Sequence, residues 1–210
     1  MAYEKKNIRA VIEEINSRKI YLPAIQRKYV WDDDQITRLM DSIMLGYPIG
    51  TFLFWKVRKS IINKKEYSMY EFIKDFHERD VYKNPSAPQP FPIGSDEETI
   101  WAVLDGQQRL TSLYIALQGS MSRKLPNKRW KNDDAFPIKE LYLDLHSQRT
   151  DEEDISYEFK FLTQEEAKKQ KDDKLWYLVK DILKYSQDEL ETDLIIPNGW
   201  ASDKVAMKNI

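Results

Sequence analysis

The residues most suited to chemistry lie in one short segment, Asp105–Arg109, which reads DGQQR. The apolar run Ile100–Leu104 before it predicts a buried strand, and the leucine spacing over residues 110–117 predicts a helix. Gly106 lets the backbone turn between them and approach a ligand closely. A helix that begins here presents free backbone N–H groups and the positive end of its dipole, and both attract anions. The segment therefore predicts a strand–glycine–helix turn that binds an anionic, phosphate-bearing ligand.

The side chains of this turn fit the same chemistry. Arg109 carries a planar guanidinium that matches phosphate oxygens, and Gln107 and Gln108 add amide donors. Asp105 is suited to holding a divalent metal or orienting a water molecule. The sequence is equally compatible with a turn in which Arg109 pairs with Asp105 or with another carboxylate.

A second polar pair, Gln26 and Arg27, follows Pro23 in a segment that the proline keeps out of a helix. Its apolar neighbours, Leu22 and Ile25 among them, are expected to anchor the segment against the core. A half-buried arginine needs a partner, which is either a protein carboxylate or a ligand phosphate.

A cluster of basic residues surrounds Trp130, and such a cluster can contact a nucleic-acid backbone while the aromatic ring stacks on a base. A solvated loop is the simpler interpretation. The candidate nucleic-acid residues are Arg123, Lys124, Lys128, Arg129, Trp130 and Lys131.

Other constellations are weaker. Asp144, Glu158 and Lys160 could form a metal-dependent nuclease site across two strands, although a polar strand face explains them. His77 and His146 are isolated and cannot build a histidine-rich metal site. The chain has no cysteine, which excludes disulfides, thiol nucleophiles and cysteine–zinc sites.

Composition limits the class of protein. The 210 residues carry 33 basic and 35 acidic side chains, a formal charge of −2, which argues against a general polyanion-coating protein. No apolar run approaches the ~20 residues of a membrane span, and no signal peptide is recognisable at the N-terminus. The sequence predicts a soluble, cytoplasmic domain with no membrane partner.

The surrounding elements alternate between helices and strands. Helices are expected over residues 8–15 and 36–44, buried strands over 51–57 and 100–104, and half-buried strands over 141–145 and 157–161. Residues 175–183 fit a helix, although WYLV could begin as a strand. Residues 58–99, with four prolines close together, are expected to form an insertion with a proline-rich loop.

Two stretches, LPAIQRKYVWDDDQITRLMDSIMLGYPIGTFLFW and LDGQQRLTSLYIAL, resemble the N-terminal domain of GmrSD-type modification-dependent restriction enzymes. That domain belongs to the ParB/sulfiredoxin-like superfamily. The resemblance is dense over residues 8–57 and 100–119 and implies an α/β (α+β) fold with a mixed sheet, flanking helices and an insertion. It implies a ParB-like nucleotide-binding domain over residues 1–200, with 201–210 as a frayed tail or the start of a helix leading to a C-terminal domain.

The resemblance also implies a function. The DGQQR turn would bind a nucleoside triphosphate and hydrolyse it with Mg²⁺, with Arg109 and Arg27 on the phosphates and Asp105 on metal or water. Such domains usually precede a separate nuclease domain in anti-phage defence proteins, so we expect an NTPase without nuclease activity of its own. The alternative is a non-enzymatic module that binds DNA or senses its modification; a homo-oligomer also stays open. The implied catalytic residues are Asp105, Gln108 and Arg109, and the implied nucleotide-binding residues are Gln26, Arg27, Gly106, Gln107, Gln108 and Arg109.

Overall fold

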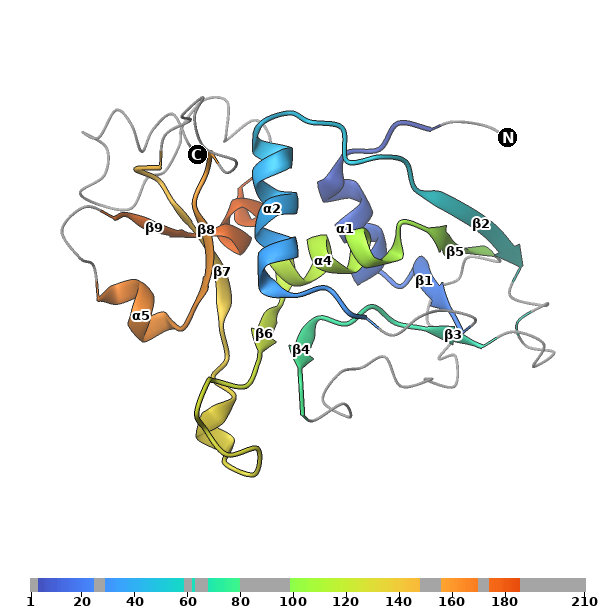
Figure 1. Ribbon diagram of the computed structural model, residues 1–210. Helices are drawn as coiled ribbons and strands as arrows, with labels where there is room; N and C mark the ends of the chain where they lie inside the picture. Colours follow the sequence, from blue (N-terminus) through green and yellow to red (C-terminus); the bar gives the residue numbers. More distant parts are fainter. Residues whose placement is uncertain are drawn as a thin grey trace.

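The computed structural model describes residues 4–24, 29–58, 62, 68–79, 99–147, 156–169 and 174–185. Helices and strands are interleaved along the chain, and parallel and antiparallel strand pairs occur together (Figure 1). The predicted α/β class with a mixed sheet is therefore confirmed. The ParB-like assignment stays a prediction, as do the domain bounds, and residues 201–210 lie outside the described residues.

The sheet that leads into the candidate turn has the strand order β2-β5-β1-β3. Its strands are β1 (Ile20–Pro23), β2 (Leu53–Arg58), β3 (Met69–Tyr70) and β5 (Thr99–Asp105). β5 runs parallel to β1 and antiparallel to β2, and its central residues Ala102 and Val103 are fully buried. The strand expected over 51–57 exists as β2, but the prediction that it is buried was wrong. β2 is an edge strand of the sheet as far as the structure describes it, and Val57 is its one fully buried side chain.

A second sheet, of order β8-β7-β9, packs beside helix α2 (Asp33–Met44). It consists of β7 (Glu140–Asp144), β8 (Phe159–Leu162) and β9 (Trp176–Leu178). The expectation that residues 141–145 are half-buried was wrong, because β7 is central and covered on both faces. Residues 175–183 adopt the strand alternative, with β9 followed by the 3-10 helix η3 (Val179–Lys184).

Part of the segment expected to be an insertion contributes to the fold. Residues 68–79 contain β3, which pairs with β1, and β4 (Asp75–His77), which pairs in parallel with β6 (Ser120–Ser122). Phe72 and Ile73 are buried in the main core. At the other positions of 58–99, the structure describes Arg58, Ile62 and Thr99, and the proline-rich stretch lies outside the described residues.

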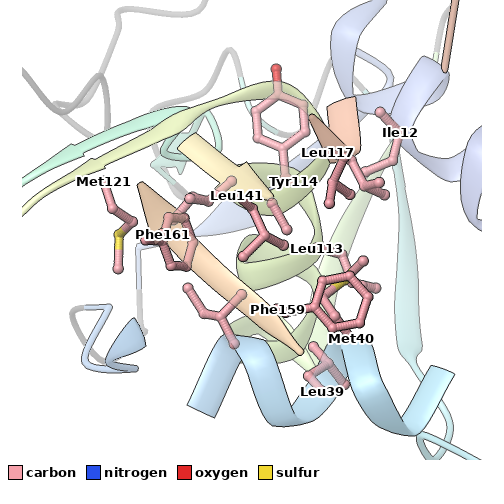
Figure 2. Close-up of a cluster of buried hydrophobic side chains, with 14 of the residues drawn as sticks. Ile12, Leu39, Met40, Leu113, Tyr114, Leu117, Met121, Leu141, Phe159 and Phe161 are labelled. Carbon is pink, nitrogen blue, oxygen red and sulfur yellow. The ribbon is translucent and has the colours of Figure 1, made fainter. Parts of the chain in front are cut away.

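Two of the helices, α1 (Ile8–Asn16) and α2, begin at caps that the sequence shows. Asn7 caps α1, and Asp32 caps α2 through a capping box with Gln35. α4 (Gln107–Gln118) is buried from Leu110 to Leu117 and is the helix around which α1, α2 and the two larger sheets gather (Figures 1 and 2). In the part of the chain that the structure describes, no helix has the length and apolar character to cross a membrane.

Candidate functional site

The predicted strand–glycine–helix turn is present at the junction of β5 and α4. β5 ends at Asp105, Gly106 adopts a left-handed conformation with φ +83°, and α4 begins at Gln107. Helices usually begin with a Ser, Thr, Asp or Asn that caps the first amides. At α4 the cap is Gly106, which has no side chain to make the capping hydrogen bond. Gly106 therefore does not offer the first-turn amides the N-cap side-chain acceptor that most helices have.

Gly106 is required by its surroundings as well as by its backbone angle. A Cβ built on Gly106 would lie 2.5 Å from Cδ1 of Phe52, a distance that atoms in contact do not reach. The aromatic ring therefore packs directly against the turn. Any side chain here would push the ring away from the start of α4.

Arg109 folds back from the first turn of α4 onto the loop that precedes β2. Its guanidinium donates to the carbonyl oxygens of Ile49 and, at 3.0 Å, of Thr51. The same group lies over the Phe52 ring, 5.1 Å from its centre, and Nη2 lies 3.7 Å from Oδ2 of Asp105. Arg109 therefore ties the loop to the turn. This pairing with Asp105 is the alternative to phosphate binding that the sequence left open. The ion pair is loose, since the Asp105 side chain is 72% exposed.

Gln107 and Gln108 use their side chains to hold the turn. The Gln107 amide donates to the carbonyl oxygen of Val103, back along β5. Oε1 of Gln108 accepts the backbone N–H of Val30 at 3.0 Å. Both glutamines thus connect the start of α4 to neighbouring segments.

The segment after the predicted Gln26–Arg27 pair also docks on α4. The hydroxyl groups of Tyr29 and Ser112 lie 2.8 Å apart, and Ser112 donates to the carbonyl oxygen of Gln108 at 2.8 Å. Burial raises the pKa of the Tyr29 hydroxyl well above its usual value of 10.0, so it stays protonated. Gln26 and Arg27 themselves lie outside the described residues. The first described residues beyond them, Tyr29 and Val30, are the ones that contact α4.

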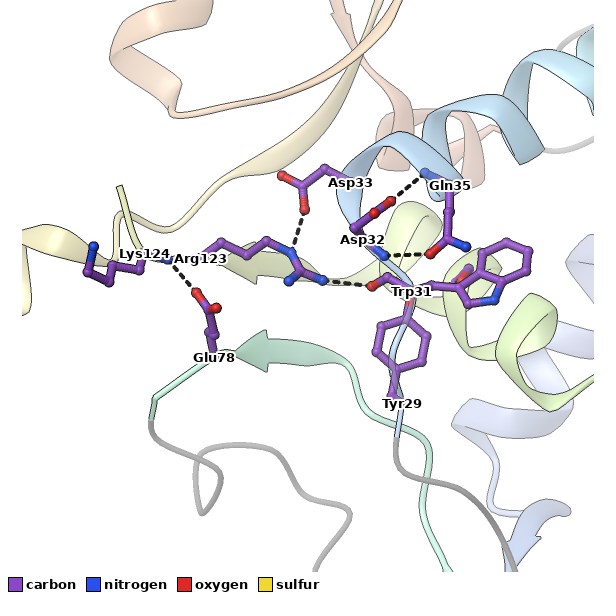
Figure 3. Close-up of polar contacts among 9 residues, drawn as sticks. Tyr29, Trp31, Asp32, Asp33, Gln35, Glu78, Arg123 and Lys124 are labelled. Atoms are coloured by element: carbon purple, nitrogen blue, oxygen red, sulfur yellow. Dashed lines mark hydrogen bonds and ion pairs between the residues drawn. The ribbon is translucent and has the colours of Figure 1, made fainter. Parts of the chain in front are cut away.

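Two of the predicted nucleic-acid residues are engaged inside the fold. Arg123 donates to Oδ1 of Asp33 at 2.8 Å and to the carbonyl oxygen of Trp31 at 2.7 Å (Figure 3). The backbone N–H of Lys124 donates to Glu78 at 2.7 Å. Burial raises the pKa of Asp33, and the neighbouring Arg123 opposes that rise. The other four candidates are exposed in the loop that follows: Lys128, Arg129, Trp130 and Lys131.

The weaker constellations have structural contacts. Asp144, 4% exposed, accepts the backbone N–H groups of His146 and Leu175, each at 3.0 Å, and so holds a chain reversal. Lys174, rather than Lys160, pairs with Glu158. His77 stacks on Phe136 with ring centres 5.1 Å apart. Among the described residues, no three histidine or carboxylate side chains are grouped so that they could hold a metal ion.

The loop on which Arg109 rests was not predicted from the sequence. Ile49, Thr51 and Phe52 form the wall of the turn, and Gly50, with φ +83°, leaves room for the Arg109 guanidinium. The two glycines of the GYPIG stretch, Gly46 and Gly50, were a signal of a tight loop. Nothing local in that stretch indicates that the loop meets a helix 58 residues later.

The fold and the site define a mixed α/β domain with a strand–glycine–helix turn at its centre. Residues 8–207 match the family described as GmrSD restriction endonuclease, N-terminal domain. Since that match covers nearly the whole sequence, the chain belongs to this family.

A curated relative, an uncharacterized protein of Methanocaldococcus jannaschii, is 29% identical over 117 residues. The matched segment covers 56% of this chain and 18% of the relative. The chain therefore matches a small part of a much longer protein.

Proposed function

We propose that this domain binds a nucleoside triphosphate at the Asp105–Arg109 turn, hydrolyses it with Mg²⁺, and serves a DNA restriction or anti-phage defence protein. The observation that carries the proposal is the glycine turn at the start of α4, where Gly106 takes the position of a capping residue and brings the chain into the helix in a left-handed conformation. Backbone N–H groups at such a position bind phosphate oxygens, and the helix dipole favours their charge. Membership of a restriction endonuclease family supports the defence context.

The residues of the turn would have two roles, binding phosphate and positioning the neighbouring segments. The amides of Gln107, Gln108 and Arg109 would contact phosphate oxygens, while the Arg109 guanidinium holds the 49–51 loop beside them and supplies positive charge. Gln108 fixes the turn through Val30. Gln26 and Arg27, carried over from the family resemblance, would close over the phosphates.

Asp105 fits the role of a magnesium ligand. Its carboxylate ends a buried strand, is 72% exposed, and is only loosely paired with Arg109. Carboxylate oxygens are the protein ligands that Mg²⁺ prefers, and the ion would neutralise charge on the transferred phosphoryl group. Without the ion, the same carboxylate can orient the attacking water.

The family description supports the proposal of a larger assembly. A separate nuclease domain or partner would cut DNA, and this domain would regulate it. The alternative function is a module that binds nucleotide or DNA without turnover. The exposed cations around Trp130 are the observation that favours DNA contact.

A thermal-shift panel tests nucleotide binding. Each of the four nucleoside triphosphates is added with Mg²⁺ to the wild type, to Arg109→Ala and to Arg38→Ala, which removes an exposed arginine from α2. Ligand at 100 times its Kd stabilises by about 2.7 kcal/mol, or roughly 5–10 °C at this chain length. We expect that shift in the wild type and Arg38→Ala, and its loss in Arg109→Ala.

Phosphate release then separates turnover from binding. Asp105→Asn is expected to keep the nucleotide-induced shift and to lose hydrolysis. The proposal fails if no nucleotide shifts the wild type, or if Arg109→Ala shifts as much as the wild type. Binding without phosphate release would leave the non-enzymatic module as the function.

A further inference from the structure

The segment between β6 and β7 is an ordered arm that extends away from the rest of the described chain (Figure 1). Its base is closed by the pairing of Met121 with Lys139 and by a 2.7 Å hydrogen bond from Leu125 to Ala135. Two successive turns, Leu125–Lys128 and Arg129–Asn132, then form the tip. These backbone bonds fix the tip in place.

Arg79, two residues after the end of β4, holds the tip. Arg79 donates to the carbonyl oxygen of Trp130 at 3.2 Å and to Oδ1 of Asp133 at 2.5 Å. Its guanidinium lies over the Phe136 ring, 4.8 Å from the centre, and the Trp130 ring meets Phe136 edge to face at 5.3 Å. The tip is thus organised before any partner binds, which lowers the entropy cost of binding.

The tip presents three cations that the fold does not use. Lys128, Arg129 and Lys131 are exposed, and among the described residues their side chains take part in no ion pair or hydrogen bond. Asp133 is paired with Arg79, so Asp134 is the one exposed carboxylate of the loop left to oppose them. The tip therefore keeps a net positive charge on a chain whose total charge is −2.

Trp130 adds an aromatic surface in the middle of these cations. The side chain is 49% exposed, although a tryptophan has more to gain from burial than almost any other residue. A groove of about 610 Å³ opens next to the arm, lined among others by His77, Phe136 and the exposed Ile138. Charge, an exposed indole and an adjoining groove thus occur together.

We propose that the arm tip binds single-stranded nucleic acid, with Lys128, Arg129 and Lys131 on successive phosphates and Trp130 stacked on an unpaired base. Cations alone would hold any polyanion, and duplex DNA keeps its bases stacked inside. An exposed indole gains only where a base is free to stack, which favours a single strand. The surface is separate from the Asp105–Arg109 turn, so the inference does not depend on nucleotide binding.

Fluorescence anisotropy with labelled oligonucleotides, in the absence of nucleotide, tests the proposal. The probes are a mixed-sequence single-stranded DNA, the matching RNA and the matching duplex, each titrated across a range of salt concentrations. Neutralising three phosphates of a single strand gives a slope of about −2 in log K against log salt. We expect both single strands to bind more tightly than the duplex, and comparison of DNA with RNA shows which one is preferred.

Three variants and one control test which residues of the arm tip contact the nucleic acid. Lys128→Gln/Arg129→Gln/Lys131→Gln should flatten the salt slope, whereas the control Lys5→Gln/Lys160→Gln/Lys169→Gln, three exposed lysines elsewhere, should leave it near −2. Trp130→Ala should weaken single-strand binding about tenfold with an unchanged slope. Trp130→Tyr, which keeps a stacking ring, should restore most of the affinity and also controls for the fold of the loop.

Several results would overturn the proposal. One is an unchanged salt slope in the arm-tip triple variant. Another is a salt slope that flattens as much in the control triple variant as in the arm-tip triple variant. Duplex binding as tight as single-strand binding, with Trp130→Ala unaffected, would reject the stacking role.

Discussion

Replacing Gly106 with alanine tests whether the turn depends on direct packing against Phe52. At φ +83°, a non-glycine residue costs about 1–2 kcal/mol. The new Cβ would also lie 2.5 Å from Cδ1 and 3.0 Å from Cε1 of Phe52, and such overpacking costs about 1–3 kcal/mol. The stiffer unfolded chain returns about 0.4–1 kcal/mol, which leaves a net loss of about 1–4.5 kcal/mol, with a midpoint of about 3 kcal/mol.

Gly46 provides a matched control. It has φ +74°, and a Cβ there would meet no atom within 4 Å. Gly46→Ala should therefore cost only the backbone strain, about 0–1.5 kcal/mol after the unfolded-state gain. The two variants should differ by about 2 kcal/mol, or about 4–8 °C in Tm for a chain of this length.

Urea unfolding followed by circular dichroism measures both free energies of unfolding. Repeating the Gly106→Ala change in a Phe52→Leu background, where the side chain can move aside, should reduce its cost to nearly that of Gly46→Ala. Equal costs for the two glycines in the wild-type background would refute the packing argument. So would an undiminished cost in the Phe52→Leu background.

Two further predictions concern carboxylates of α2, the buried Asp41 and the half-buried Asp33. Asp41, 4% exposed, accepts the backbone N–H groups of Ser156 and Tyr157 at 3.2 and 2.7 Å. Asp41→Ala should therefore lower the free energy of unfolding by about 2–4 kcal/mol, and Asp41→Asn should lower it by less. Equal losses for the two variants in urea unfolding would contradict this prediction. Burial raises the pKa of Asp33 above 3.8, so its contribution to stability is full below that value and declines as pH rises through the folded pKa. Because Arg123 opposes the rise, Arg123→Gln should move the pKa of Asp33 higher still, and an NMR carboxyl titration showing a fall would refute the assignment.

The local elements could be predicted because their signals are local. Caps at Asn7 and Asp32, the apolar periodicity of α2 and the sequence from β5 through Gly106 into α4 all depend on contacts a few residues apart. The predictions of burial were wrong where strand pairing between distant segments decides which strand is central and which lies at an edge. The alternating pattern of 141–145 could not show that β7 lies between two strands, and the apolar pattern of 51–57 could not show that β2 lies at an edge.

The sequence by itself determined that a glycine turn with a carboxylate, two glutamines and an arginine begins a buried helix. The tertiary structure decided what those side chains contact: Arg109 holds carbonyls of the 49–51 loop, and Gln108 holds Val30. It also divided the basic cluster, directing Arg123 to Asp33 and leaving Lys128, Arg129 and Lys131 at the surface. The physical reason is the same for the turn and for the basic cluster. Long side chains reach partners that folding brings near from distant parts of the chain, and residue type alone does not specify which partner that is.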